Sequence, residues 1–318
     1  MNRSQGAIRL GRIAGIELYL HWSWFLVAAI EIESRGSSYT SISWNILEYL
    51  ALFLIVTLHE FGHALACRQV GGTADRILLW PLGGVAYVNP PPRPGATLWS
   101  IAAGPLVNVA LLPVLMGLAA HGQALGWAQT MPNANAFLHA IVYINLGLLL
   151  FNLVPVYPLD GGQILRSLLW FVLGRARSLL VSTVLGFAGA AAFVAFALWS
   201  RSLWFGLLAA FFVYSCWRGF GQARILRQME KLPRREEWRC PFCKTAPPAA
   251  DLWICRRCGG RYDTFATLGV CPTCGSESAL TACPECGRMS PIGEWQVPVA
   301  LPEADIERRS HDRINSNG

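Results

Sequence analysis

The first two thirds of the chain contain few charged side chains. Residues 1–216 carry only 18 of them, whereas the last 102 residues carry 27, and 53% of the whole chain is hydrophobic. This asymmetry excludes a single water-soluble globule, because several apolar runs approach the length that crosses a bilayer. The sequence therefore predicts a membrane-embedded first part and a water-soluble appendage.

The appendage lacks the dense run of one charge sign that a nucleic-acid-binding surface usually shows. Residues 217–318 carry 15 basic and 12 acidic side chains, and the net charge of the whole chain is +7. This mixed pattern argues against nucleic acid as a partner and favours contact with the surface of the lipid bilayer.

Six apolar segments are candidates for membrane spans: 18–30, 44–67, 97–120, 136–154, 179–199 and 203–216. The first and last are short, because a span needs about 20 residues. No small-residue cleavage site follows the first segment, which argues against a removable signal peptide. With six spans and a cytosolic N-terminus, 24 of the 26 basic residues lie inside, as the positive-inside tendency predicts.

These observations predict an α-helical polytopic membrane protein with about six transmembrane helices and both termini in the cytosol. The compact single chain suits a bacterial inner membrane. We expect four regions: an intramembrane domain over 1–218, a basic juxtamembrane linker helix over 219–238, a cysteine-rich domain over 239–290 and a flexible tail over 291–318.

The segment 77–88, between the second and third apolar runs, is rich in β-forming residues. Pro81, Gly83 and Gly84 interrupt it. It therefore predicts a membrane-associated β-hairpin instead of a helix.

The second apolar run contains the pattern H-E-x-x-H as His59, Glu60 and His63. Four residues apart on a helix, two imidazoles share one face and can bind one Zn²⁺, and the glutamate beside them can act as a general base. Polar side chains in a membrane helix are costly, and a metal ion compensates for that cost. The alternative is that the histidines only form hydrogen bonds between helices, which would leave Glu60 without a partner.

Catalytic zinc usually has three protein ligands, so a third ligand is expected. Asp160 is the best candidate, because Pro155 and Pro158 break the preceding helix and Gly161 frees the backbone to present the carboxylate on non-helical chain. From hydropathy alone, without H-E-x-x-H, the favoured alternative is that Asp160 is an ordinary helix-terminus residue in a juxtamembrane turn.

At this point the chain resembles the site-2 protease family of intramembrane zinc metalloproteases. The resemblance rests on His59 to His63, Pro81 to Gly84, Gly104 to Asn108 and Asn152 to Gly162, and it covers about residues 7–218. It implies His59, His63 and Asp160 as zinc ligands, Glu60 as the general base and Asn152 as a residue that positions the substrate or its oxyanion. The chain is most similar to the compact six-span branch, because no segment is long enough for a PDZ insert and none indicates CBS domains.

A helical substrate must unwind before its backbone can be attacked, and the predicted hairpin offers an edge that could hold an extended peptide by main-chain hydrogen bonds. We therefore expect Gly83, Gly84 and Asn108 to contribute to substrate binding. For Asn108 the alternative is a hydrogen bond between helices. Asn145, His21 and His139 are further polar residues in the apolar part, and for the two histidines structural hydrogen bonds are the simpler interpretation.

Eight of the ten cysteines form four C-x-x-C pairs in the appendage, which is typical of structural zinc. Sequential pairing would give one ribbon of Cys240, Cys243, Cys255 and Cys258, and a second of Cys271, Cys274, Cys283 and Cys286. Crossed pairing is the alternative. Reduced thiolates place the appendage in the cytosol. Tyr262, Phe265 and Trp295 could be a recognition surface or the small core.

The sequence thus predicts a zinc metalloendopeptidase that cuts membrane proteins within or near their transmembrane segments, in regulated intramembrane proteolysis. Its expected cofactors are one catalytic and two structural zinc ions. The expected partners are a single-span membrane protein as substrate and a cytosolic protein at the ribbons. One alternative is a non-proteolytic scaffold that recruits partners through the ribbons, and a zinc transporter is another.

Overall fold

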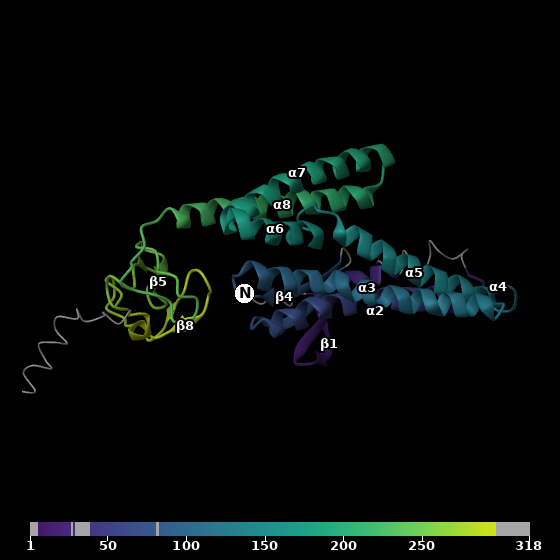
Figure 1. Ribbon diagram of the computed structural model, residues 1–318, viewed down its shortest axis with the longest axis horizontal. Helices are drawn as coiled ribbons and strands as arrows, with labels where there is room; N and C mark the ends of the chain where they lie inside the picture. Colours follow the sequence, from purple (N-terminus) through teal and green to yellow (C-terminus); the bar gives the residue numbers. More distant parts are fainter. Residues whose placement is uncertain (1–5, 27, 29–38, 81–82, 297–318) are drawn as a thin grey trace, which may run out of the picture. The chain divides into compact units, whose positions relative to one another are not determined.

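The computed structural model describes residues 6–26, 28, 39–80 and 83–296 (Figure 1). The chain divides into two compact units, Met1–Arg227 and Gln228–Gly318. The division falls inside helix α8, Leu203–Glu230, which continues from the sixth apolar segment into the basic stretch. The apolar segment and most of the predicted linker helix therefore form one helix.

Four helices of the described residues are long and apolar enough to cross a membrane: α2 Ile42–Gln69, α3 Pro94–Ala124, α5 Pro132–Leu153 and α7 Arg175–Ser200. They coincide with the second to fifth apolar segments of the sequence. Two shorter helices of the described residues, α4 Trp127–Thr130 and α6 Asp160–Leu173, lie between them in the sequence. Helices α2, α3 and α5 lie side by side (Figure 1). The protein is accordingly a multi-pass membrane protein.

The prediction of a first span over 18–30 is wrong for its first residues. They belong to strand β2, Ile16–His21, in which Ile16, Leu18 and Leu20 are buried and the residues between them are partly exposed. This period of two is the pattern of a strand with one buried face. In the rest of the predicted span, residues 23–26 and 28 are helical, and 27, 29 and 30 lie outside the described residues.

Four strands form one sheet in the order β1-β2-β3-β4, with β1 at Ala7–Ile13, β3 at Thr73–Trp80 and β4 at Gly83–Asn89. β3 and β4 pair antiparallel, as the predicted hairpin requires, while β2 and β3 pair parallel. One face of the sheet, including Ile77 and Leu79, packs with Ala64 and Cys67 of α2 in one buried cluster. The sheet is thereby fixed against the helix that carries H-E-x-x-H, and β4 is one of its two edge strands.

The second unit consists of four short strands and an aromatic core. β5 Trp253–Ile254 pairs with β6 Arg261–Tyr262, and β7 Thr281–Ala282 pairs with β8 Met289–Ser290. Trp238, Phe265 and Trp295 pack together, and Trp295 is fully buried. These aromatics are the core and not a recognition surface. The ordered unit extends through the 3-10 helix Ile292–Trp295, beyond the predicted boundary at 290, and 297–318 lie outside the described residues.

Candidate metal centres

Helix α2 places His59, Glu60 and His63 on one buried stretch of the membrane unit. The three residues are 3%, 6% and 7% exposed, and their donor atoms lie within 4.8 Å of one another. Spacing by one turn brings the two Nε2 atoms to 3.1 Å. The pattern that the sequence singles out therefore forms a convergent cluster of donor atoms.

Asp160 completes this cluster. Its Oδ2 lies 3.0 Å from Nε2 of His59 and 3.3 Å from Nε2 of His63. Ligands at about 2.0 to 2.1 Å in a zinc tetrahedron lie about 3.3 Å apart, so the three atoms have the spacing of three tetrahedral ligands. Asp160 is the first residue of α6. The sequence predicts that non-helical chain presents Asp160. In the structure Asp160 instead begins a helix, directly after the irregular segment 154–159.

The outer nitrogen of each histidine has a partner of its own. Nδ1 of His59 lies 2.6 Å from Oδ1 of Asn108, and Nδ1 of His63 lies 2.9 Å from the backbone oxygen of Ser100. Because a backbone oxygen can only accept, His63 donates from Nδ1, and in the neutral imidazole the lone pair then lies on Nε2, which faces Asp160. Such outer partners orient metal-binding histidines.

Helix α3 approaches these histidines closely at Gly104. A Cβ at this position would lie 2.3 Å from Nε2 of His63 and 2.8 Å from Nε2 of His59. Only a glycine leaves room for both imidazoles there. The cluster therefore depends on a backbone approach as well as on its donor atoms.

Glu60 lies beside the three donors and faces the edge strand. The backbone N–H of Ala86 in β4 donates to its Oε2 at 2.8 Å. A Cβ at Gly84 would lie 2.2 Å from Cγ of Glu60, so the glycine is what lets the strand approach the carboxylate. The hairpin predicted from the sequence thus holds the candidate base in place.

The other predicted residues lie in different settings. The Asn108 amide is engaged by His59 and by Asn145, which agrees with the alternative of a hydrogen bond between helices. Asn152 is half-buried in the last turn of α5. His21 contacts Ser23 and His139 contacts Gln123, so each histidine has a local hydrogen-bond partner.

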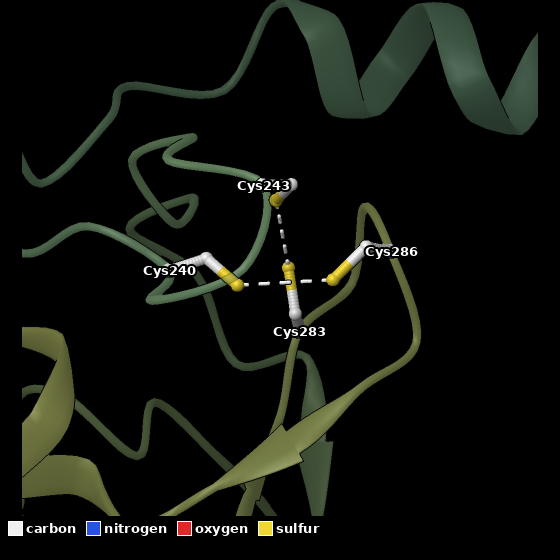
Figure 2. Close-up of side chains that lie close together, drawn as sticks. All are labelled: Cys240, Cys243, Cys283 and Cys286. Atoms are coloured by element: carbon white, nitrogen blue, oxygen red, sulfur yellow. Dashed lines mark hydrogen bonds between the residues drawn. The ribbon is translucent and has the colours of Figure 1, made fainter. Parts of the chain in front are cut away.

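The cysteines of the second unit form two groups of four, and they are nested instead of sequential. Cys240 and Cys243 meet Cys283 and Cys286 (Figure 2), with Sγ atoms 3.7 Å apart in two pairs across the group. Four thiolates at about 2.3 Å from one zinc lie about 3.8 Å apart, so this group has the size of a tetrahedral site.

The inner group consists of Cys255, Cys258, Cys271 and Cys274, with two cross-pairs at 3.6 Å. The prediction of sequential pairing is therefore wrong. The physical reason lies in the core, where Trp238 packs with Phe265 and Trp295 and the N–H of Arg239 donates to the Trp295 oxygen. These contacts bring the two ends of the unit together, and with them the first and fourth C-x-x-C pairs.

All four C-x-x-C pairs share one backbone turn. In each, the first cysteine accepts from the N–H four residues later, and that fourth residue has a positive φ: Lys244 (60°), Gly259 (75°), Gly275 (68°) and Gly287 (71°). Such a turn directs both thiols to one side. Burial raises the pKa of Cys271, but hydrogen bonds from the backbone of Cys274 and Thr273 and from neighbouring thiols outweigh it and lower that pKa to about 6.

The chain is similar to known proteins over its membrane unit. Peptidase family M50 matches residues 48–127 and 122–196. A zinc metalloprotease of Methanocaldococcus jannaschii is 34% identical over 210 residues, which are 65% of this chain and 58% of that protein. Stage IV sporulation protein FB of Bacillus subtilis is 27% identical over 156 residues, or 47% of this chain and 46% of that protein.

A solved structure of a site-2 protease from Methanocaldococcus jannaschii aligns with a TM-score of 0.49 and 28% identity, over 67% of this chain and 95% of that one. The chain spans about half the length of the curated relatives it matches, 58% and 46% for the two above. The matched residues include H-E-x-x-H and Asp160, which meet in the structure. Over residues 48–196 the membrane unit of this chain matches peptidase family M50, the family of the site-2 proteases.

Proposed function

We propose that this protein is an intramembrane zinc metalloendopeptidase that hydrolyses peptide bonds within or near the transmembrane segments of membrane proteins. The observation that carries the proposal is the convergence of His59, His63 and Asp160 with Glu60 at their side, inside a membrane unit of family M50. A closed structural zinc site has no need of a base beside its ligands.

Zinc fits the three donors, because two imidazole nitrogens and a carboxylate are a common set for catalytic zinc and leave a fourth position open. Bound there, the metal supplies Lewis acidity that polarises a carbonyl and lowers the pKa of water. His59, His63 and Asp160 would hold it. Glu60 takes the proton from the attacking water and passes it to the leaving amine, and its hydrogen bond from Ala86 keeps the carboxylate oriented for both transfers.

The substrate would lie as an extended strand along β4. β4 is one of the two edge strands of the sheet, and its residue Ala86 contacts Glu60, so a peptide paired with this edge passes next to the base. Residues on a strand alternate in direction, which points the N–H groups of Ala86 and Val88 to the same side. Gly83 and Gly84 belong to the same edge, and Asn152 is proposed to position the scissile carbonyl or its oxyanion.

Val88→Pro tests this edge, with Val88→Ala as the matched control for side-chain loss. The proline removes the N–H of residue 88, which points to the same edge of β4 as the N–H of Ala86, and it leaves the hydrogen bond from Ala86 to Glu60 in place. We therefore expect slower cleavage with an unchanged zinc content. If Val88→Pro and Ala86→Pro both cleave at the wild-type rate, pairing at this edge is excluded.

The two cysteine groups are proposed as closed structural zinc sites, which makes three zinc ions per chain together with the catalytic one. Their S–S spacings support this assignment. We further propose that the zinc-binding unit lies in the cytosol of a bacterial cell, where its thiols stay reduced, and that it contacts a cytosolic protein or the substrate's cytosolic part.

Quantitative membrane proteomics on native cells with either the wild-type chain or Glu60→Gln tests the proposed activity. The variant keeps the zinc ligands and removes the base, so we expect one or a few intact single-span proteins to accumulate. The scaffold function would be favoured instead by two results together. The membrane proteomes of wild-type and Glu60→Gln cells would be the same under several stress conditions, and deletion of residues 238–290 would change the cell.

A further inference from the structure

Three polar side chains, His59, Asn108 and Asn145, form a continuous buried hydrogen-bond network from the proposed zinc ligand His59 to helix α5. Nδ1 of His59 lies 2.6 Å from Oδ1 of Asn108, and Nδ2 of Asn108 donates to Oδ1 of Asn145 at 2.8 Å. Nδ2 of Asn145 donates to the backbone oxygen of Asn108 at 2.9 Å. Asn108 and Asn145 are both fully buried, so water does not compete for these groups.

The direction of every hydrogen bond in this network follows from its last member. The backbone oxygen of Asn108 can only accept, so the atom of Asn145 that contacts it is the amide nitrogen. The oxygen of Asn145 therefore faces Asn108 and requires a donor, which turns the Asn108 nitrogen to Asn145 and the Asn108 oxygen to His59.

An amide oxygen at His59 can only accept, so Nδ1 of His59 carries the proton. Neutral imidazole then has its lone pair on Nε2, which is the atom that lies 3.0 Å from Oδ2 of Asp160. If Asn108 were flipped, its NH₂ group would face Nδ1 and favour the tautomer with a proton on Nε2, which cannot bind a metal. The orientation of one amide thus decides whether His59 is a ligand.

We propose that Asn145 is a positioning residue for the catalytic zinc site, which holds the Asn108 amide in the orientation that makes Nε2 of His59 available to the metal. Asn145 contacts neither the three donor atoms nor Glu60 in any contact described above, and it acts through Asn108. This inference rests on the proposed zinc site but not on proteolytic activity.

The test is the zinc affinity of the full-length protein in detergent, measured by equilibrium dialysis against graded chelator buffers followed by zinc determination. Asp160→Ala supplies the baseline of the two cysteine sites, and the zinc bound above this baseline reports the membrane site. Outer partners of metal ligands commonly change metal affinity about 10- to 100-fold, so we expect Asn145→Leu to weaken the membrane site at least about tenfold.

Asn45→Leu is the matched control, because Asn45 is also buried, lies in α2, and its Oδ1 has no hydrogen-bond partner among the described residues. It should leave the zinc affinity unchanged. Equal zinc affinities of Asn145→Leu and Asn45→Leu would overturn the proposal.

A double variant separates orientation from packing. In Asn108→Asp either carboxylate oxygen accepts from His59, so the direction of the group no longer matters. Adding Asn145→Leu to Asn108→Asp should then change the zinc affinity less than about twofold, whereas a packing role would cost the same tenfold in both backgrounds. A wild-type protein with no zinc above the Asp160→Ala baseline would instead refute the zinc site itself, which keeps the two failures distinct.

Discussion

The membrane unit and the cysteine-rich unit both gather metal-binding side chains, but they do so by different means. In the membrane unit the donors come from helices that are distant in sequence, and the three donor atoms of the proposed zinc site converge beside Glu60. In the second unit each group of four thiols is complete, and short turns supply them in pairs. An open site with a base is suited to catalysis, and a closed site is suited to holding a fold.

The difference also concerns what supports the ligands. Buried side chains and backbone oxygens orient His59 and His63 in the membrane unit, whereas local backbone turns orient the cysteines. Loss of a metal should therefore inactivate the first unit without unfolding it, and should unfold the second unit, which has only a small core.

The largest expected effect on function is that of Asp160→Ala. The variant loses one of the three protein ligands, so we expect two zinc ions per chain instead of three and proteolysis at background level, while the four helices remain folded. Zinc analysis of the purified protein together with circular dichroism measures both quantities. Retention of three zinc ions would refute Asp160 as a ligand.

Cys240→Ser should disrupt the second unit in a pattern that reveals the pairing. With nested sites, Cys243, Cys283 and Cys286 become reactive toward a thiol reagent, and the inner group of four stays protected by its own zinc. Mass spectrometry of the labelled peptides reads this out. Under sequential pairing, Cys255 and Cys258 would react instead of Cys283 and Cys286.

Gly84→Ala should impair catalysis without removing zinc. The added Cβ would lie 2.2 Å from Cγ of Glu60 and displace either the base or the edge strand, and a displacement of about 1 Å can cost about 100-fold in rate. Gly117→Ala is the control, because its Cβ would meet no atom within 4 Å. An unimpaired Gly84→Ala would show that this contact does not position the base.

The smallest expected effect is that of Arg235→Ala in the second unit. Its guanidinium donates twice to Oδ2 of Asp263, at 2.7 and 3.0 Å, and Asp263 is only 8% exposed. Loss of a hydrogen-bonded charged partner costs about 1 to 3 kcal/mol. Hydrogen exchange over residues 228–296 measures the loss, and Arg9→Ala, which removes the ion pair with Glu17 in the membrane unit, is the control that should leave this exchange unchanged.

Much of the membrane site follows from the sequence because its signals are local. H-E-x-x-H fixes two donors and a base by helical spacing alone, and Pro155 and Pro158 mark the break before Asp160. The hairpin follows from its β-forming residues and glycines, and four of the six apolar segments coincide with long apolar helices.

The remaining features depend on contacts between distant segments. Part of the strand at Ile16–His21 is predicted as an apolar run because Tyr19, on the partly exposed face between Leu18 and Leu20, is itself a largely apolar side chain. The nested cysteine pairing depends on the packing of Trp238 and Trp295 against Phe265 and on the hydrogen bond from Arg239 to Trp295. All four cysteine pairs have the same C-x-x-C spacing, which does not decide which pairs meet. The hydrogen-bond network of His59, Asn108 and Asn145 joins three helices. In the sequence, only the presence of asparagines in apolar runs could have indicated it.

The central claim is that Glu60 acts as the base at a zinc site inside the membrane unit. The most direct test is to purify the wild-type protein and Glu60→Gln with equal zinc content and to incubate each in proteoliposomes with a membrane protein that accumulates in cells carrying the variant. We predict cleavage by the wild-type protein and a rate lower by about 10² to 10⁴ for Glu60→Gln. Cleavage by Glu60→Gln at the wild-type rate would contradict the claim.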